Sequence, residues 1–301
     1  MAQIKTIAFI GLGIMGTPIA ANLMKAGFEL HVWARRREKA EALLTAGAKW
    51  HGSAASAAHA ADAVITMLGE PKDVESVWLG TDGLIGAARS GAFLIDMTTS
   101  SPSLAARLHE EGSRRGLRVL DSPVTGGRAG AENAKLALFV GGEKGDFDAC
   151  ASVWSAVSAR ASYMGKAGSG QAAKAANQIA VAGVLSGVCE SLAYARAAGL
   201  DLNELFPLLC AGSAKSSQLE KIGAKILAGD DTPSFFVRYL AKDLRIGVGE
   251  AASLGLTLEV ARDALANLDE LTARGMGELG TQALVHHYEK KALPHVRKDL
   301  L

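Results

Sequence analysis

The stretch IKTIAFIGLGIMG, from Ile4 to Gly16, decides the fold of the amino-terminal half. Its first part, Ile4 to Ile10, is a short apolar run rich in β-branched residues, which predicts a strand. The glycine turn GLGIMG follows directly, and the next segment, TPIAANLMKAG, has helical spacing. A strand, a glycine turn and a helix in this order are typical of a dinucleotide-binding βαβ unit.

Each glycine of this turn has a physical task in such a unit. Gly11 forms the tight turn, Gly13 lets the backbone approach a pyrophosphate, and Gly16 allows close packing of helix on strand. The pyrophosphate would bind backbone N–H groups at the positive end of the helix. We therefore expect the cofactor to contact the whole turn, which consists of Gly11, Leu12, Gly13, Ile14, Met15 and Gly16.

The residues after the second expected strand, Glu29 to Ala34, indicate which nicotinamide cofactor is bound. An NAD site usually has Asp or Glu there, which binds the ribose 2′-hydroxyl. This chain has Arg35, Arg36 and Arg37 instead, and Glu38 comes only afterwards. Guanidinium groups pair with phosphate, so the run favours NADP over NAD, with Arg35 and Arg36 as the contacts. The alternative is a solvated charge run at the start of the next helix.

Strands alternating with helices continue along this half and predict a parallel, doubly wound sheet. The runs Ala63 to Leu68 and Ala92 to Ser101 are expected to be strands, with a helix at VESVWLG between them. Such sheets bind ligands at the carboxyl ends of their strands. We therefore expect Met67, Leu68 and Thr99 to face the cofactor.

A second glycine turn, Thr125 to Gly127, opens the loop TGGRAGAENAKLALFVGG. The backbone N–H groups of Gly126 and Gly127, with the hydroxyl of Thr125, would suit a small carboxylate, as backbone nests do. A plain hairpin turn is the alternative. Arg128 follows, and it is either a solvent-exposed side chain or a cation for a second anionic group of the substrate.

The segment GSGQAAKAANQIAVAGVLSGVCESLAYARAAG, from Gly168 to Gly199, predicts one long helix, because helix formers dominate and no proline interrupts it. Apolar residues occupy every face, so we expect the helix to be buried nearly all round. Lys174 shares one face with Asn177 and Gln178, which suggests a ligand there; a structural lysine is the alternative. The uncharged run is short for a membrane span and contains two amide side chains.

After this helix only helical periodicity is found. We expect an α/β Rossmann-type domain with a doubly wound sheet, residues 1–164, followed by an all-α domain, residues 165–301, joined by the long helix. His286 and His287 lie close to Glu289, and a surface helix is a better explanation for them than a metal site. The final segment LPHVRKDLL reads as a polar tail.

Composition restricts the function further. The 301 residues are 49% hydrophobic and 21% charged, with a net charge of +1, as in a globular chain of about two domains. A net charge this close to zero does not indicate binding to nucleic acid or to an anionic membrane. The three scattered cysteines, Cys150, Cys189 and Cys210, indicate neither a disulfide framework nor a zinc site, and we expect no metal site and a cytoplasmic location without a signal peptide.

Several segments agree in order and spacing with one family: FIGLGIMGTPIAANL, DMTTSSP, DSPVTGGRAGAENAKLALFVGG, GSGQAAKAANQI and AKDLRI, which runs from Ala241 to Ile246. Over nearly its whole length the chain resembles the β-hydroxyacid dehydrogenases, which include 3-hydroxyisobutyrate dehydrogenase and tartronate semialdehyde reductase. The resemblance implies that Lys174 is the catalytic group and that Lys242 lies by the cofactor. It also implies that the turn at Thr125, Gly126 and Gly127 holds the substrate carboxylate.

The implied reaction is reversible hydride transfer between NADP and a short β-hydroxyacid. Lys174 would donate a proton to the carbonyl oxygen during reduction and accept it during oxidation. A free lysine has a pKa near 10.4, which burial among alanines would lower. The family often has two asparagines after this lysine, so Gln178 beside Asn177 implies an altered substrate pocket. In the family the C-terminal helices pair between subunits, so the resemblance implies a homodimer or homotetramer.

Two other functions stay open at this point. One is a related enzyme acting on a sulfonated aldehyde or an imine, although the retained Lys174 weakens the imine version. The other is a catalytically silent NADP-binding protein, against which the same lysine argues. Hydroxyisobutyrate, tartronate semialdehyde, succinic semialdehyde and glyoxylate all fit a carboxylate turn plus a lysine, so the sequence does not identify the substrate.

Overall fold

The computed structural model describes residues 4–292, and its contacts divide the chain into two compact units, Met1–Lys174 and Ala175–Leu301. The division lies inside the long helix, later than the boundary at 164/165 expected from the sequence. The first turn of this helix belongs to the sheet unit because the side chain of Gln171 hydrogen-bonds the backbone of Thr98 and Ser100. The expected tail, LPHVRKDLL, lies outside the described residues.

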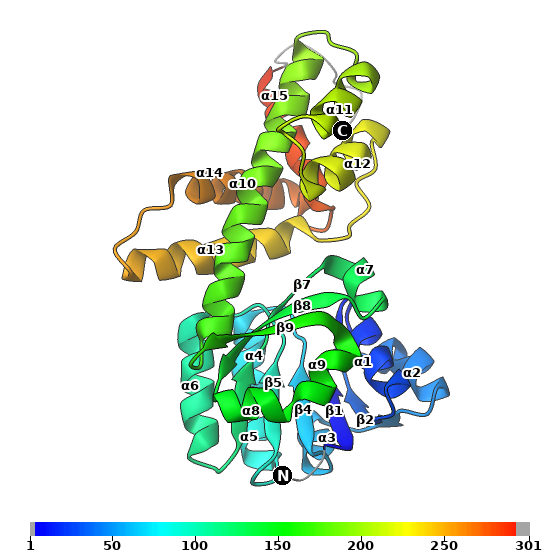
Figure 1. The fold of residues 1–301 in the computed structure, drawn as a ribbon, viewed down its shortest axis with the longest axis vertical. Helices are drawn as coiled ribbons and strands as arrows, with labels where there is room; N and C mark the ends of the chain where they lie inside the picture. Colours follow the sequence, from blue (N-terminus) through cyan, green and yellow to red (C-terminus); the bar gives the residue numbers. More distant parts are fainter. Residues whose placement is uncertain (1–3, 293–301) are drawn as a thin grey trace. The chain divides into compact units, whose positions relative to one another are not determined.

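The first unit is built on one mostly parallel sheet (Figure 1). Within residues 4–292, nine strands follow the order β3-β2-β1-β4-β5-β6-β8-β7, and β9 pairs with β8. The chain passes outward from β1 to β2 and β3, then returns to the other side of β1 with β4, so the predicted doubly wound sheet is confirmed. The strands are β1 Thr6–Ile10, β2 Glu29–Trp33, β3 Lys49–Trp50, β4 Ala63–Thr66, β5 Phe93–Asp96, β6 Arg118–Asp121, β7 Val124–Thr125, β8 Leu136–Gly142 and β9 Ser158–Gly165.

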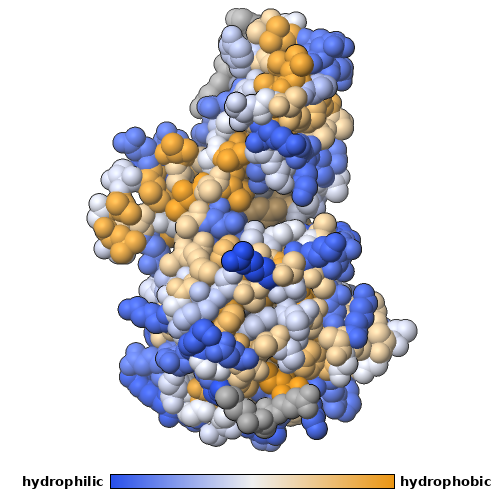
Figure 2. Space-filling view, in the orientation of Figure 1, coloured by the Kyte–Doolittle hydropathy of each residue, from blue (hydrophilic) through white to orange (hydrophobic). Residues whose placement is uncertain are grey.

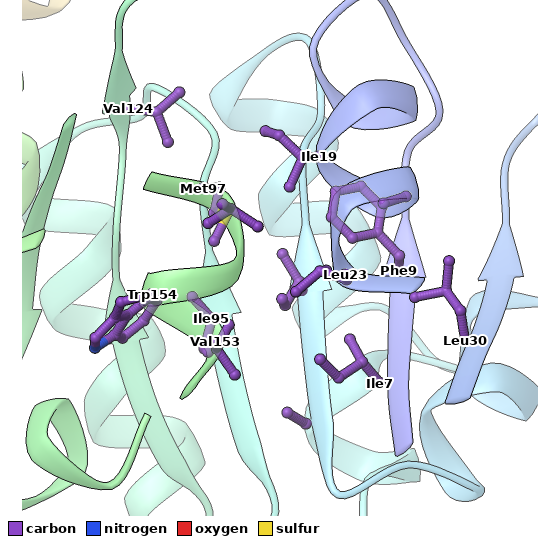
Figure 3. Packing of buried hydrophobic residues seen from close by; sticks show 14 of the residues in the cluster. Ile7, Phe9, Ile19, Leu23, Leu30, Ile95, Met97, Val124, Val153 and Trp154 are labelled. Carbon is purple, nitrogen blue, oxygen red and sulfur yellow. The ribbon is translucent and has the colours of Figure 1, made fainter. Parts of the chain in front are cut away.

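Alternation along the buried strands gives each face of the sheet its own core. Ile7 and Phe9 of β1 point to one face and belong to the buried cluster there, which also contains Leu23 and Trp154 (Figure 3). Their neighbours Ala8 and Ile10 belong to the core of the other face, with Trp78. The covering helices are α1 Gly16–Lys25, α2 Glu41–Thr45, α3 Ala54–His59, α4 Pro71–Leu79, α5 Leu84–Ala87, α6 Pro102–Ser113, α7 Gly127–Glu132, α8 Lys144–Ala149 and α9 Ala151–Val157.

The segment expected to be a loop after Thr125 is more ordered than the sequence suggested. It contains the short helix α7 and the strand β8, which pairs antiparallel with β6 and β7. This strand was not predicted from the sequence, because Gly141 and Gly142 lower the strand propensity of the segment. They are required here, since a Cβ atom on Gly142 would lie 2.5 Å from the side chain of Leu120.

The second unit is helical, as expected. Its core contains Leu185 and Leu192 of the long helix, packed with Leu240, Leu244 and Leu268. The helices are α10 Ser169–Ala197, which begins in the first unit, α11 Leu202–Ala211, α12 Ala224–Ala228, α13 Val237–Ser253, α14 Glu259–Leu271 and α15 Val285–Ala292. Short turns of other helix types lie at Leu219–Gly223, Thr272–Met276 and Thr281–Leu284 in this unit, and at Arg37–Ala40 in the first unit.

The expected long helix is confirmed as α10, Ser169–Ala197, but the expectation of burial nearly all round is wrong. Leu185 and Leu192 are buried, whereas Val184 is 42% exposed and Tyr194 is 74% exposed. The reason is that neighbouring helices cover only one stripe of α10. By length and composition α10 also passes the test for a membrane-crossing helix, as core helices of globular domains do, and its buried stripe packs within this unit.

Candidate active site

The glycine turn between β1 and α1 has the shape that a bound dinucleotide needs. Gly11 has φ +102°, and a Cβ atom built on it would lie 2.3 Å from the carbonyl oxygen of Met67. A Cβ atom on Gly16 would lie 2.0 Å from the carbonyl oxygen of Gly11. In contrast, a Cβ atom on Gly13 would meet nothing within 4 Å. Gly11 and Gly16 therefore serve the fold, and Gly13 leaves open space where a ligand can approach the backbone.

The start of α1 can accept an anion. Among residues 4–292 no side chain caps this helix, and its first turn has no acidic residue. In this turn the Thr17 N–H already donates to the Gly13 carbonyl at 3.1 Å and Pro18 has no N–H, so an anion would be held by the positive end of the helix dipole and the N–H groups of the glycine turn. Backbone hydrogen bonds from Gly11 to Trp33, 3.0 Å, and from Met67 to Ile10, 2.9 Å, bring the ends of β2 and β4 beside the turn.

The arginines after β2 are exposed. The Arg35 side chain is 81% exposed and its Nη1 lies 3.8 Å from Asp73 Oδ1, while the Arg36 side chain is 70% exposed and 3.7 Å from Glu38. Ion pairs between exposed side chains such as these contribute little to the stability of the protein. Arg37 differs, because its guanidinium lies 5.6 Å from the ring centre of Trp50. Arg35 and Arg36 are thus accessible to a phosphate at the end of the second strand.

A buried hydrogen-bond network joins the ends of β4 and β5. The Leu68 N–H donates to Thr98 Oγ1 at 2.9 Å, and the Thr98 N–H and the Thr66 hydroxyl both donate to Asp96 Oδ1. Burial raises the pKa of Asp96 to about 6, against hydrogen bonds that lower it. The expected cofactor residues Met67, Leu68 and Thr99 are each half-buried at these strand ends. Asp96 was not singled out from the sequence, although a carboxylate ending an apolar strand, FLID, was a usable signal.

Asp96→Asn is expected to change how stability depends on pH. The pKa of this carboxyl is raised from 3.8 to about 6 by folding, so its contribution to stability is present below pH 4 and is lost as the pH rises through 6. Between pH 4 and pH 7 the loss amounts to about 2 kcal/mol. Urea unfolding at several pH values measures the free energy of unfolding of both proteins. The value for the variant minus the value for the parent should increase by that amount from pH 4 to pH 7. A difference that stays constant with pH contradicts the assignment.

The second glycine turn also starts a helix. Gly126 and Gly127 have φ values of +126° and +63° and are exposed, and Thr125 directly before them ends β7. The Arg128 side chain is 58% exposed, and its Nε lies 2.7 Å from Glu132.

A groove of about 760 Å³ lies beside the first glycine turn. It is lined by Leu12, Gly13 and Ile14 of the turn, by side chains of α1 and α2, and by Arg128 and Glu132. Arg128 and part of the cofactor turn therefore share one groove. The other expected cofactor residues of this unit do not line the groove; they are Gly11, Met15 and Gly16 of the turn, together with Arg35, Arg36, Met67, Leu68 and Thr99.

Lys174 lies in the first part of α10 and is only 6% exposed. One turn earlier, Gln171 is 1% exposed and is tied to the residues that follow β5. Asp121, at the end of β6, accepts hydrogen bonds from the start of the same helix. The sequence reasoning identified Lys174 but missed Asp121 and Gln171. The signals were a carboxylate ending the apolar strand RVLD and an amide three residues before the lysine.

In the second unit the remaining expected residues are joined by an ion pair and two hydrogen bonds. Lys242 Nζ lies 3.0 Å from Asp243 Oδ1, and Gln178 Nε2 donates to Asp243 Oδ2 at 2.6 Å. Asn177 Nδ2 donates to Gln178 Oε1 at 2.7 Å. A carboxylate only accepts, so Gln178 must turn its NH₂ group to Asp243 and its oxygen to Asn177. The longer side chain of Gln178 is thereby held by Asp243, and Asn177 keeps its own amide oxygen for another donor.

The expectation that His286 and His287 of α15 lie on a surface helix is wrong for His287. His287 is 1% exposed, with Nδ1 3.1 Å from Glu270, so an exposed surface helix does not explain it. His286 Nε2 lies 2.9 Å from Asp231, and its hydrogen bond with Glu289 raises the pKa of His286. His287 is buried because α15 packs that side on the helical core. Among the described residues no three His, Cys, Asp or Glu side chains group as metal ligands would.

Two family models together match most of the chain. Residues 6–165 match the NAD binding domain of 6-phosphogluconate dehydrogenase. Residues 168–288 match the model described as NAD-binding of NADP-dependent 3-hydroxyisobutyrate dehydrogenase. The junction between the models precedes α10, so the second match contains Lys174, Asn177, Gln178 and Lys242.

Individual proteins agree with these matches. The chain is 41% identical over 280 residues to the uncharacterized oxidoreductase YkwC of Bacillus subtilis, covering 93% of this chain and 97% of the relative. It is 33% identical to 2-hydroxy-3-oxopropionate reductase of Escherichia coli, covering 95% and 98%. The structure of 3-hydroxyisobutyrate dehydrogenase from Mycobacterium tuberculosis with L-serine is similar with a TM-score of 0.84 at 29% identity, covering 94% of this chain and 99% of that one.

Proposed function

This chain belongs to the NAD(P)-dependent hydroxyacid dehydrogenases of the 3-hydroxyisobutyrate dehydrogenase type, and on that premise we propose that it interconverts a short β-hydroxyacid and its aldehyde or keto acid with NADP. The observation that carries the proposal is Lys174, a buried lysine at the start of α10 in the unit that contains the glycine turn. The test is a panel of small aldehyde acids with NADPH, ranked by kcat/KM.

The first unit fits a nicotinamide dinucleotide. The open space over Gly13 and the uncapped start of α1, among the described residues, suit a pyrophosphate. Exposed Arg35 and Arg36 at the end of β2 suit a 2′-phosphate, and no carboxylate stands at that point of the sequence to bind a 2′-hydroxyl. These features support NADP as the preferred cofactor and NAD as the weaker one.

Arg35→Ala is expected to shift the cofactor preference. Removal of one guanidinium partner of the 2′-phosphate should weaken NADP binding by about tenfold, or about 1.4 kcal/mol, and leave NAD binding nearly unchanged. Titration calorimetry with both cofactors measures the ratio of the two dissociation constants. Arg37→Ala is the matched control, because Arg37 stacks on Trp50. An unchanged ratio in Arg35→Ala would remove the argument for NADP.

Within this proposal each of the expected site residues has a defined role in the reaction. The nicotinamide supplies or accepts the hydride when the cofactor is bound. Lys174 donates a proton to the carbonyl oxygen of the substrate during reduction and takes it back during oxidation. Thr125, Gly126 and Gly127 hold the substrate carboxylate with a hydroxyl and exposed backbone N–H groups. Asn177 and Gln178 bind the rest of the substrate, with Lys242 near the cofactor.

The substrate class follows from these donors. A carboxylate turn plus one ammonium favours small semialdehydes and glyoxylate-type acids over neutral ketones. A sulfonated aldehyde is the second candidate, because Arg128 shares a groove with the cofactor turn and offers a further cation. An imine substrate is less well supported, since imine reduction does not need the retained Lys174. In the panel, faster turnover of a sulfonated aldehyde than of any carboxylate would favour the second candidate.

We also propose that the chain forms a homodimer or homotetramer through its helical unit. Large apolar side chains are exposed where α13 connects to α14: Leu254 is 75% exposed, Leu256 57% and Val260 65%. Figure 2 shows hydrophobic side chains gathered at this end of the two helices. Exposed patches of this kind usually mark an interaction surface. Light scattering that gives the mass of a single 31.1 kDa chain would contradict the proposal.

A further inference from the structure

The start of α10 is held by a side chain from the sheet. Asp121 Oδ1 accepts a hydrogen bond from the N–H of Gly168, and Oδ2 accepts one from the N–H of Gln171, both at 2.8 Å. N–H groups at the start of a helix have no partner within the helix. Asp121 therefore caps α10 from the end of β6, where the helix dipole favours a negative charge.

The surroundings of Asp121 are shaped for this carboxylate. Asp121 is 3% exposed, and burial raises its pKa while the hydrogen bonds from Gly168 and Gln171 lower it. A Cβ atom on Gly141 would lie 2.5 Å from Oδ1, and one on Gly170 would lie 2.7 Å from Oδ2. Glycines at both positions thus leave just enough room for the carboxyl group, and any side chain there would displace it.

Gln171 provides a second attachment of the same helical turn. Its Oε1 accepts a hydrogen bond from the Ser100 N–H at 2.9 Å, and its Nε2 donates to the Thr98 carbonyl at 2.7 Å. Thr98 in turn holds the N–H of Leu68 at the end of β4. The first turn of α10 is therefore fastened to the carboxyl ends of β5 and β6. Lys174 follows Gln171 by three residues and lies on the same side of the helix.

We propose that Asp121 and Gln171 are positioning residues, which fix Lys174 with respect to the cofactor edge of the sheet and to the turn at Thr125–Gly127. The inference rests on the proposed role of Lys174 as proton donor. Asp121 is suited to this task because it ends β6 only four residues before Thr125, so its carboxyl group ties the start of the helix to the strand that leads into the turn. Neither residue contacts the reacting atoms in this proposal.

Asp121→Asn tests the proposal in a double-mutant cycle. The amide keeps the shape of the side chain but turns an NH₂ group towards one of the two backbone N–H groups, so the start of α10 loses a hydrogen bond. A shift of Lys174 by about 1 Å should lower kcat by about 100-fold, with the dissociation constant of NADP unchanged. In the Lys174→Ala background the same change should lower kcat by less than about threefold, because its effect acts through the lysine.

A second measurement does not depend on activity. Hydrogen–deuterium exchange of the peptide covering residues 168–175 should become faster in Asp121→Asn and in Gln171→Met, in protein without cofactor. Asp146→Asn is the matched control, because Asp146 pairs with Arg118 at the other end of β6, at 2.6 Å. This control should leave both kcat and the exchange of residues 168–175 as in the parent.

The outcomes separate this inference from the proposed function. An equal loss of kcat in the parent and in the Lys174→Ala background, or unchanged kcat and exchange in both variants, overturns the positioning role. If Asp121→Asn does not fold, Gln171→Met carries the same cycle, because it leaves the hydrogen bonds of Asp121 in place. If Lys174 itself is dispensable, the proposed function fails; if Lys174 is required but Asp121 and Gln171 are not, only the positioning role fails.

Discussion

Lys174→Ala is expected to lower kcat for reduction of the best aldehyde acid by about 1,000-fold, while NADP binding stays within about twofold of the parent. General acid catalysis by a positioned side chain contributes about 100- to 10,000-fold, and alanine removes the donor altogether. The cofactor should still bind, because the glycine turn and the arginines after β2 are unchanged. Single-turnover reduction followed by NADPH absorbance measures the chemical step, and titration calorimetry measures cofactor affinity.

Lys174→Arg distinguishes proton donation from simple attraction of charge. Arginine keeps the positive charge but does not give up its proton near neutral pH, so this variant should be nearly as slow as alanine. Lys166→Ala is the matched control, because Lys166 lies shortly before α10 and is exposed. A Lys174→Arg enzyme with nearly full kcat would show that the charge alone is needed. Full activity in Lys174→Ala would refute the assigned role.

Gly13→Val and Gly16→Ala are expected to fail in different ways. A Cβ atom on Gly13 meets nothing within 4 Å in the protein, so the valine variant should fold with the stability of the parent. Its side chain fills the space proposed for the pyrophosphate, so NADP affinity should fall by at least about tenfold, or about 1.4 kcal/mol. A Cβ atom on Gly16 lies 2.0 Å from the carbonyl oxygen of Gly11, so Gly16→Ala should cost about 1–3 kcal/mol of stability.

Thermal unfolding and cofactor titration of the two variants, made side by side, check this contrast. The expected pattern is a normal melting temperature with weak NADP binding for Gly13→Val, and a lowered melting temperature for Gly16→Ala. NADP affinity like that of the parent in Gly13→Val would mean that the cofactor does not approach the backbone at Gly13. The cofactor site would then have to lie elsewhere in the first unit.

The parts of this protein that could be predicted from sequence are those with local causes. The run Ile4 to Gly16 has apolar β-branched residues, then glycines at fixed spacing, and each of these acts within a few residues. The long helix of 169–197 likewise follows from its composition and the glycines at its ends. Lys174 was recognisable because a cation among alanines has no local reason to be buried.

The remaining features depend on contacts between distant segments. Asp121 caps a helix that begins 48 residues later, which no periodicity near Asp121 reveals. The strand β8 was hidden because its glycines make room for Asp121 and Leu120, and only the packed sheet shows that need. The exposed stripe of α10 has the same origin, since helix composition does not tell how many neighbours cover it. His287 was likewise expected at the surface, because the sequence alone does not show that this side of α15 packs on the helical core.

The most direct test of the role of Lys174 is a crystal structure of the protein with NADP and an unreactive analogue of the aldehyde acid. We expect the Nζ atom of Lys174 within about 3 Å of the oxygen that replaces the substrate carbonyl, with the carboxylate of the analogue on Gly126 and Gly127. A lysine whose Nζ atom bonds only to protein groups, far from the analogue and from the nicotinamide ring, would contradict the account.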